Sequence, residues 1–473
     1  MNVNLAANIF WSGMDKLSMQ LLQLITTVII ARLIAPSEYG LIALTTVFLA
    51  LAQIFVDSGF CVAIIQKNVL DVKVYSSVYY FNLLISVIIY VLLYFLALAI
   101  ADFYNEPLLS LILRVVGLNI IISAFSYVQK AYLSITYRLK IQAKITFGAM
   151  LLGSTIGITM AFNGFGVWAL VVQTLLTNFC SCVLLCVFSG WRPVWAFSFL
   201  SLKELFSFGS KIFLSSLTQV VFVNSYSIVI GKIYDASVLG CFNRVQTILN
   251  LLSDNIMNIL NRPVFVYLCQ NRNDMSVAKK NFESYLRFSS FIIFPIMVGG
   301  FVLSESFILT VLTSEWIRAV PIFRILTVAF LFIPITFVNS NMLKVLGYSS
   351  LYLKLTILQR SIGVVVLLLT IKFSLYVLCC GVVLSYFFDS LVAILILKRV
   401  FDTSIYRQIK LLFPVLCTSL LMGMFICIVI GSIDSVCLKF FIGIIIGIFS
   451  YTVLSILFNV NEVKKILLFA KRR

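Results

Sequence analysis

The chain of 473 residues is 62% hydrophobic and 11% charged, whereas a soluble domain is about 45–50% apolar and about 25% charged. This much apolar surface cannot be hidden in a water-soluble core, so soluble and disordered chains are excluded. The net charge of +18 would raise nucleic acid as a partner of a soluble protein, but basic loops on one side of a membrane explain it, and we expect no nucleic-acid partner.

Helix-length apolar runs follow one another along the whole chain. A bilayer core about 30 Å thick needs about 20 residues of helix, and an open strand could not satisfy its backbone in lipid. We therefore predict an all-α polytopic membrane protein with about 14 transmembrane helices, and a tight glycine turn at Asn163–Gly166. The spans are expected near residues 10–32, 40–65, 78–101, 109–129, 145–162, 166–189, 207–230, 238–261, 286–304, 322–343, 352–371, 374–397, 411–431 and 437–459.

The basic residues predict the orientation of these spans. Most of the 35 lysines and arginines fall in loops and span ends on one side if the N-terminus is cytoplasmic. Because basic residues accumulate on the cytoplasmic side, we expect both termini to be cytoplasmic. Met1–Phe10 has no basic side chain before the apolar run, so a cleavable signal peptide is not expected.

Two stretches, Trp11–Gly40 and Phe206–Gly240, resemble each other. Each is a helix-length apolar run that carries polar residues and ends in a short loop closed by glycine. The loops Ala31–Gly40 and Gly231–Gly240 align without a gap, with small, basic, apolar, serine and glycine positions matched. A membrane span with one wet face, used twice, predicts two halves around a polar cavity.

The repeat extends to Arg114 and Arg324, which lie near the starts of the fourth and tenth spans. Spans 1–6 and 7–12 are therefore predicted to be parallel repeats, related by an axis along the membrane normal. We predict an N-terminal lobe at 1–200, a C-terminal lobe at 201–400, and two additional spans with a basic cytoplasmic tail at 401–473.

Polar side chains recur at helical spacing on four spans, namely one, two, seven and eight. A charge at the middle of a bilayer costs roughly 2.5–3.5 kcal/mol, so these stripes should face protein or water rather than lipid. The residues are Ser12, Asp15, Lys16, Gln20, Gln23 and Thr27; Thr46, Gln53 and Asp57; Lys211, Ser215, Thr218 and Ser225; and Asn243, Thr247, Asn250, Asp254 and Asn258.

Each half offers a lysine on its first span and an aspartate on its second, Lys16 with Asp57 and Lys211 with Asp254. We interpret these as an inward-facing pocket, in which lysines dock an anionic head group and aspartates hold the lysines when it is absent. Arg244 would guide the substrate nearer the outer side. The alternative interpretation is that the lysines are orientation anchors that snorkel to the interface, and that Arg244 is a loop-end arginine.

Residues for ordinary catalysis are scarce. Histidine is absent, which removes the commonest general base and metal ligand, and the cysteines sit mostly inside apolar runs without a metal-binding spacing. Glu305, Glu315 and Asp389 are isolated in the sequence. We therefore expect no enzyme activity, no metal and no cofactor, apart from a coupling ion, H+ or Na+.

Several motifs carry a family resemblance: Ala31–Ala43, Asp57–Phe60, Phe103–Pro107, Gly164–Leu170, Trp191–Pro193, Phe206–Lys211 and Leu239–Arg244. Together they resemble the Wzx/WzxC-type polysaccharide flippases of the MOP exporter superfamily over roughly residues 10–350. The second half departs from the first at Leu239, where the first has Tyr39, and lacks its proline.

The resemblance implies a two-lobed, V-shaped bundle whose spans 1, 2, 7 and 8 line a central cavity. It implies a flippase that moves undecaprenyl-pyrophosphate-linked oligosaccharide outward across the bacterial inner membrane by alternating access. The product would be O-antigen, capsule or exopolysaccharide, and the partners would be membrane lipids and other polysaccharide assembly proteins. Two rivals remain, an ion-coupled multidrug or toxin antiporter of the same superfamily and a membrane glycan polymerase or ligase. The basic set Lys16, Lys211 and Arg244 favours an anionic cargo over a cationic drug.

Overall fold

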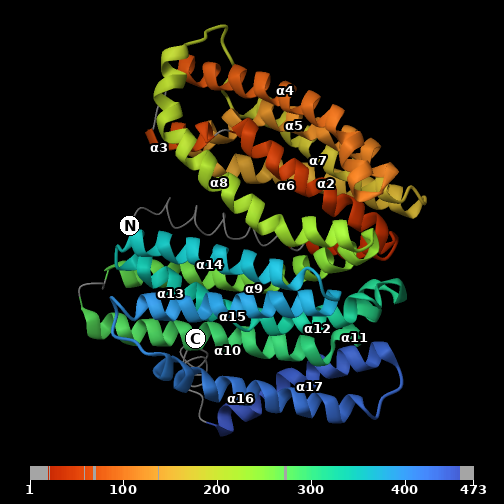
Figure 1. The fold of residues 1–473 in the computed structure, drawn as a ribbon, viewed down its shortest axis with the longest axis vertical. Helices are drawn as coiled ribbons and strands as arrows, with labels where there is room; N and C mark the ends of the chain where they lie inside the picture. The colour runs from red at the N-terminus through yellow and green to blue at the C-terminus, as the bar shows by residue number, and fades with distance from the viewer. Residues whose placement is uncertain are drawn as a thin grey trace. The chain divides into compact units, whose positions relative to one another are not determined.

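The structure is a computed structural model that describes residue 20 and residues 22–57, 59–67, 71–136, 138–270 and 274–458. Every regular element in these ranges is a helix, which confirms the predicted all-α fold (Figure 1). The elements are α2 (Pro36–Asp57), α3 (Phe60–Lys67), α4 (Val72–Tyr104), α5 (Pro107–Ile135), α6 (Leu139–Phe162), α7 (Val167–Phe188), α8 (Phe199–Ile233), α9 (Ala236–Gln270), α10 (Met275–Val302), α11 (Ser304–Phe307), η1 (Ile308–Leu312), η2 (Ser314–Trp316), α12 (Ala319–Phe330), α13 (Ile333–Val345), α14 (Ser349–Thr370), α15 (Leu375–Leu397), α16 (Ile405–Ile430) and α17 (Val436–Leu457).

Twelve of the fourteen predicted spans correspond to described helices that are long and apolar enough to cross a membrane. About half of the first predicted span lies outside the described residues, and its described half contains the shorter apolar helix Leu22–Ala31. The eighth corresponds to α9, a helix of 35 residues that is long enough but too polar to be among the twelve. Its polar stripe, the feature that marks it as a candidate lining helix, lowers its hydropathy.

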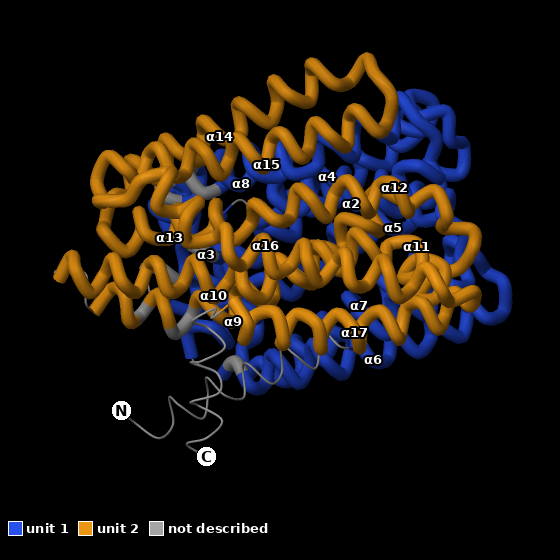
Figure 2. The backbone as a smooth tube through the Cα atoms, turned by 90° about the horizontal axis from the view of Figure 1, so that it is seen from below, with its two compact units in different colours: residues 1–240 blue, residues 241–473 orange. Residues whose placement is uncertain are grey.

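The chain forms two compact units, residues 1–240 and 241–473 (Figure 2). The boundary falls inside α9, one turn after its start. In unit 1, α8 packs against α2, α3 and α4, so the first helix of the predicted second repeat is part of the first compact unit. The predicted boundary between the two repeat lobes, near residue 200, stays a prediction.

Unit 1 is built from antiparallel helix pairs. The pairs α4–α5 and α6–α7 each pack along their length. The turn between α6 and α7 contains Gly164 and Gly166 at φ of 76° and 53°, which confirms the predicted glycine turn at Asn163–Gly166. An aromatic core of Tyr75, Tyr79 and Trp191 lies at the other end, with ring centroids of Tyr75 and Tyr79 at 6.0 and 5.8 Å from that of Trp191.

Unit 2 contains two further helix pairs, α14–α15 and α16–α17. Helix α10 packs against α16, while α12 and α13 pack against α15. The single predicted span near 322–343 is interrupted at Leu331 and Phe332, so that α12 and α13 are separate helices. Pro334 lies in the first turn of α13, where its missing N–H leaves no helical hydrogen bond unmade.

Candidate functional site

The predicted site residues divide between the units, and several lie outside the described part. Asp15 and Lys16 precede the described residues, and the side chain of Lys211, in α8, is also outside them. The Lys16–Asp57 and Lys211–Asp254 sets therefore stay predictions. The remaining candidates are Gln20, which is half-buried, Gln23, which is exposed, and Asp57 in unit 1; and Arg244, Asn250 and Asp254 in unit 2.

Asp57 ends α2 and is half-buried among polar groups of unit 1. It lies beside Cys61 of α3 and within electrostatic reach of Tyr127 of α5. Lys130, one turn further along α5, lies near Cys61 as well. Lys130 is not among the residues of the predicted polar stripes, although it stands inside α5, more than a turn before the helix ends at Ile135. This position inside the helix is the signal that could have added Lys130 to the site.

Arg244 stands in the third turn of α9 and is only 8% exposed. Its guanidinium carbon lies 5.9 Å from the ring centroid of Trp316, a fully buried side chain, in a cation–π arrangement. Arg244 is thus held inside unit 2 rather than at a loop surface. On the same helix, Asn250 is half-buried and Asp254 is exposed. The polar stripe of α9 therefore runs from a buried arginine to an exposed carboxylate.

The two resembling loops meet inside unit 1. A Cβ atom on Gly40 would lie 1.8 Å from the carbonyl oxygen of Ala236, and one on Gly240 would lie 1.9 Å from that of Pro36. The N-terminal turns of α2 and α9 therefore cross in backbone contact, which only glycine at both positions allows. The glycine that closes each repeat loop is explained by this crossing.

Glu38 links two of the family motifs, Ala31–Ala43 and Gly164–Leu170, by a hydrogen bond. Its Oε1 accepts a hydrogen bond of 3.1 Å from the backbone N–H of Val167, at the N-terminus of α7. A Cβ on the preceding Gly166 would stand 2.2 Å from the same carboxylate oxygen. A carboxylate is favoured at a helix N-terminus, so Glu38 ties the start of α2 to the start of α7.

The loop of unit 1 between α4 and α5 contacts the end of α8. Lys232 donates a hydrogen bond to the carbonyl of Phe103, and its Nζ lies 4.2 Å from the Phe103 ring centroid. Burial raises the pKa of Glu106 above its ordinary value, and the negative charge of Asp235 raises that pKa further. In this loop Tyr104 is buried and Glu106 is half-buried, whereas Asp102, Phe103 and Asn105 are exposed.

Arg114 and Arg324 make matching contacts in the two units. The Nε of Arg114 donates to the carbonyl of Tyr94 at 3.3 Å, and the Nε of Arg324 donates to the Ser304 hydroxyl at 2.7 Å. Each acceptor belongs to the residue 20 positions earlier in the chain. Arg324 also pairs with Glu305 at 3.4 Å. The spacing and the donor atom are shared, whereas one acceptor is a backbone carbonyl and the other a side-chain hydroxyl, and the repeat register stays a prediction.

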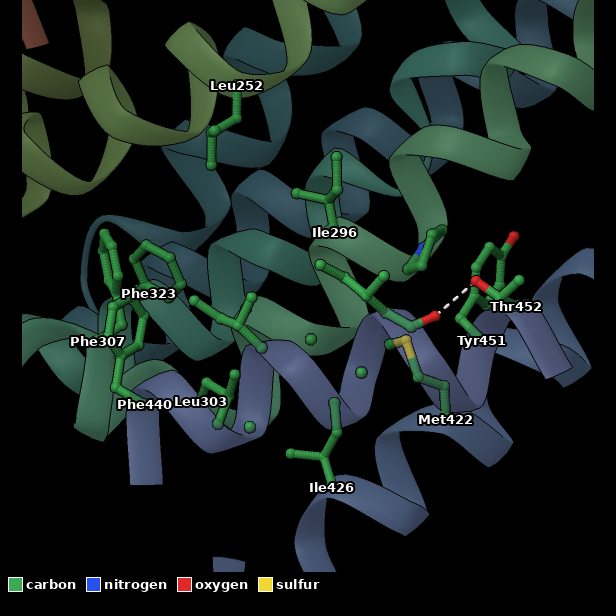
Figure 3. A pocket seen from close by; sticks show the side chains of 17 residues that line it. Leu252, Ile296, Leu303, Phe307, Phe323, Met422, Ile426, Phe440, Tyr451 and Thr452 are labelled. Atoms are coloured by element: carbon green, nitrogen blue, oxygen red, sulfur yellow. Dashed lines mark hydrogen bonds between the residues drawn. The ribbon is translucent and has the colours of Figure 1, made fainter. Parts of the chain in front are cut away.

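Unit 2 contains an apolar pocket of about 460 Å³ that the sequence did not indicate (Figure 3). Leu303, Phe323, Met422 and Ile426 supply part of its wall. Glycines of α10 and α17 open it because they place no side chain there. The hydroxyl of Thr452, at the edge of the pocket, donates a hydrogen bond to the carbonyl of Ile448 in the same helix (Figure 3). The glycines are Gly299, Gly300, Gly443 and Gly447.

The pocket was missed because α16 and α17 carry few polar residues, and the sequence treats them as additional spans. Glycines spaced four apart on one helix face, Gly443 and Gly447, were the available signal. Among the residues described, no three His, Cys, Asp or Glu side chains are placed to hold a metal ion.

The fold and these sites define a polytopic α-helical membrane protein with polar helix faces in both units and an apolar pocket in unit 2. Residues 29–321 match the family of polysaccharide biosynthesis proteins, and the chain belongs to that family. This match confirms the predicted resemblance at the level of a family of polysaccharide biosynthesis proteins.

Two curated relatives illustrate the family. The chain is 24% identical to the teichuronic acid biosynthesis protein TuaB of Bacillus subtilis (strain 168) over 328 residues, which are 67% of this chain and 66% of TuaB. It is 22% identical to the lipopolysaccharide biosynthesis protein WzxC of Escherichia coli (strain K12) over 324 residues, 67% of this chain and 65% of WzxC. The match therefore spans slightly less than two thirds of the length of these relatives.

A solved structure shows the same fold. The lipid II flippase MurJ, in an inward closed conformation, superposes with a TM-score of 0.78, covering 96% of this chain and 100% of MurJ at 16% identity. At this identity the likeness concerns the fold.

Proposed function

We propose that this chain is a flippase that moves a lipid-linked saccharide across the bacterial inner membrane for polysaccharide assembly, with undecaprenyl-pyrophosphate-linked oligosaccharide as the cargo. Family membership and the flippase-like fold support this proposal. The observation that carries it is the apolar pocket of unit 2 in a chain whose α9 presents a polar stripe. Such a cargo has an apolar chain, an anionic pyrophosphate and polar sugars, and needs both kinds of surface.

The apolar pocket and the polar residues of the protein would then bind different parts of the cargo. The pocket offers room for a few isoprene units beside α10, α16 and α17, and burial of apolar carbon there is favourable at about 25 cal/mol per Å². The polar residues of α9 and the predicted basic residues Lys16 and Lys211 would serve the head group. Lysine binds a phosphate as a point charge, and each charge is worth more in a cavity of low dielectric than in water.

Further parts of the proposal concern energy, topology and partners. A coupling ion, H+ or Na+, would drive the cycle by alternating access, and both termini would be cytoplasmic. Other polysaccharide assembly proteins would supply and consume the cargo, and the chain itself would catalyse no reaction. Reporter fusions at Arg473 and in the 102–107 loop should report opposite sides of the membrane. Reports from the same side would contradict the topology.

Loss of the protein tests the function. Cells without it should accumulate lipid-linked repeat units on the cytoplasmic leaflet, and a copy of the full chain should clear them. Accumulation of unpolymerised units on the outer leaflet would point instead to a polymerase or ligase. Unchanged lipid-linked saccharides with increased sensitivity to cationic drugs would point to a multidrug antiporter.

A further inference from the structure

The helix pair α14–α15 of unit 2 carries opposite charges near its middle. Arg360 is the twelfth of 22 residues in α14, so at about 1.5 Å per residue it lies roughly 15 Å from either end. Asp389 lies eight residues before the end of α15, roughly 12 Å from that end. The two helices follow one another along the chain and pack against each other (Figure 1). Because they run antiparallel, these positions bring the two charges to similar depth.

The two side chains differ in exposure and are not bonded to each other. Arg360 is exposed on unit 2, whereas Asp389 is half-buried. The carboxylate interacts electrostatically with the Arg360 guanidinium, but its buried Oδ1 accepts no hydrogen bond from the described residues. Gln359 fixes the backbone beside it by donating its Nε2 hydrogen to the Asp389 carbonyl at 3.0 Å.

Other charges on the packed helices are occupied elsewhere. Among described residues, α15 packs against α12, α13 and α14. Arg324 of α12 is bonded to Ser304 and Glu305, and Lys344 of α13 lies 4.3 Å from the Tyr352 ring centroid. Lys354 lies in the second turn of α14, nearer the N-terminal end of that helix than Arg360. Arg360 is therefore the cation at mid-span on this hairpin, with Asp389 as its nearby counter-charge.

A mid-span arginine that faced lipid would cost roughly 2.5–3.5 kcal/mol even on the lenient insertion scale. Intramembrane charges instead face a bundle interior or a water-filled space, and they mark substrate paths. A planar guanidinium with five donors matches the oxygens of a phosphate in bidentate geometry. The exposure of Arg360 leaves these donors accessible to such a group.

We propose that Arg360 binds a phosphate group of the cargo, and that Asp389 is a resident counter-charge which competes with it. When cargo is bound, the guanidinium turns to the phosphate. When cargo leaves, the attraction of Asp389 holds the guanidinium against the hairpin and limits the affinity, so that release stays possible. The inference rests on the proposed function, because it takes the anionic part of a lipid-linked saccharide as the ligand.

Binding of farnesyl diphosphate to the purified full-length protein in detergent tests the proposal. Arg360→Ala should weaken binding at least about tenfold, since a hydrogen-bonded charge contact is worth roughly 1.5–3 kcal/mol. Arg360→Lys should bind with an affinity between those of the wild type and Arg360→Ala, because lysine keeps the charge but cannot bind a phosphate in bidentate geometry. Asp389→Asn should tighten binding, because the competitor is removed. Arg399→Ala, which removes an exposed arginine just after the same α15, should leave binding unchanged.

The expected changes in affinity have opposite signs, weaker for Arg360→Ala and tighter for Asp389→Asn, and this difference separates a binding role from a structural one. If Asp389→Asn weakens binding as Arg360→Ala does, the pair only stabilises the hairpin and the proposal is overturned. Equal binding by wild type and Arg360→Ala would overturn it as well while leaving the proposed function intact. No binding by the wild type would count against the pyrophosphate cargo itself.

Two competitors identify the source of the phosphate. Inorganic pyrophosphate should compete weakly with farnesyl diphosphate, because it lacks the apolar chain. Vesicles of phosphatidylglycerol should not compete. If phosphatidylglycerol competes as well as farnesyl diphosphate, the site takes bilayer lipid head groups, and the assignment to cargo is wrong.

Discussion

Replacement of Gly40 by alanine should destabilise unit 1 through the helix crossing. The new Cβ would stand 1.8 Å from the Ala236 carbonyl oxygen and 3.0 Å from its Cα, and ordinary contact begins at 3.4 Å. The obstructing atoms are backbone, so no side chain can rotate away, and the helices α2 and α9 must move apart locally by about 1.5 Å. Overpacking of this kind costs about 1–3 kcal/mol.

Thermal unfolding of the purified chain in detergent measures the effect. Gly363→Ala is the matched control, because a Cβ there meets no atom within 4 Å, and it should be neutral or stabilise by about 0.5–1 kcal/mol through the gain in helix propensity. Gly240→Ala should resemble Gly40→Ala. The double variant should cost less than the sum of both, since one separation of the helices relieves both clashes. If Gly40→Ala unfolds at the same temperature as Gly363→Ala, the backbone crossing is wrong.

Three further outcomes are expected. Glu38→Ala should lower stability by roughly 0.5–2 kcal/mol, the range for loss of a helix cap, because the N–H of Val167 loses its acceptor; unchanged thermal unfolding would exclude the contact. Because Glu106 has a raised folded pKa, the folded chain binds this proton more tightly than the unfolded chain, so its stabilisation is present below the ordinary pKa and is lost as pH rises through the folded pKa. Glu106→Gln should therefore reduce the fall in unfolding temperature between acidic and neutral pH, and an unchanged profile would place the titration elsewhere. Lys16→Ala should impair glycan export at normal protein level while Lys16→Arg retains more of it, and full export by Lys16→Ala together with Lys211→Ala would mean that these lysines are orientation anchors.

The sequence predicted the helices well because membrane insertion imposes a strong pattern on length and polarity. The spans near 374–397 and 437–459 agree closely with α15, Leu375–Leu397, and α17, Val436–Leu457. Helix ends outside the apolar run were not predictable by the same rule. Thus α4 runs from Val72 to Tyr104, beyond the predicted 78–101, because its ends are stabilised by the Asp71 side chain and by Asn105 at φ of 57°.

The sequence indicated which residues matter for tertiary packing in some places, but it did not indicate their contact partners. The glycines at 40 and 240 were visible as a repeated position, but the contacts of Gly40 with Ala236 and of Gly240 with Pro36 depend on where two helices cross. The partnership of Glu38 with Val167, 129 residues apart, leaves no local pattern. For the apolar pocket the sequence offers only the spacing of Gly443 and Gly447 as a signal, because the rest of the wall has the composition of an ordinary membrane span.

The charged candidates show the same limit. Asp389 is isolated in the sequence and Arg360 belongs to none of the predicted polar stripes, because 29 positions separate the two residues that the hairpin brings together. Arg244 was weighed as a loop-end residue, and only the structure shows it buried against Trp316. A single charge in a span indicates a functional site, but its partner comes from packing.

Transport by the purified full-length chain tests the central claim most directly. A lipid-linked saccharide with a fluorescent sugar is incorporated into both leaflets of liposomes, and a membrane-impermeant quencher reports the outer fraction. With the protein present, the protected inner fraction should become accessible over time, while liposomes without protein keep it protected. If folded wild-type protein leaves the inner fraction protected, with or without a proton or sodium gradient of either direction, the chain is not a flippase for this class of cargo.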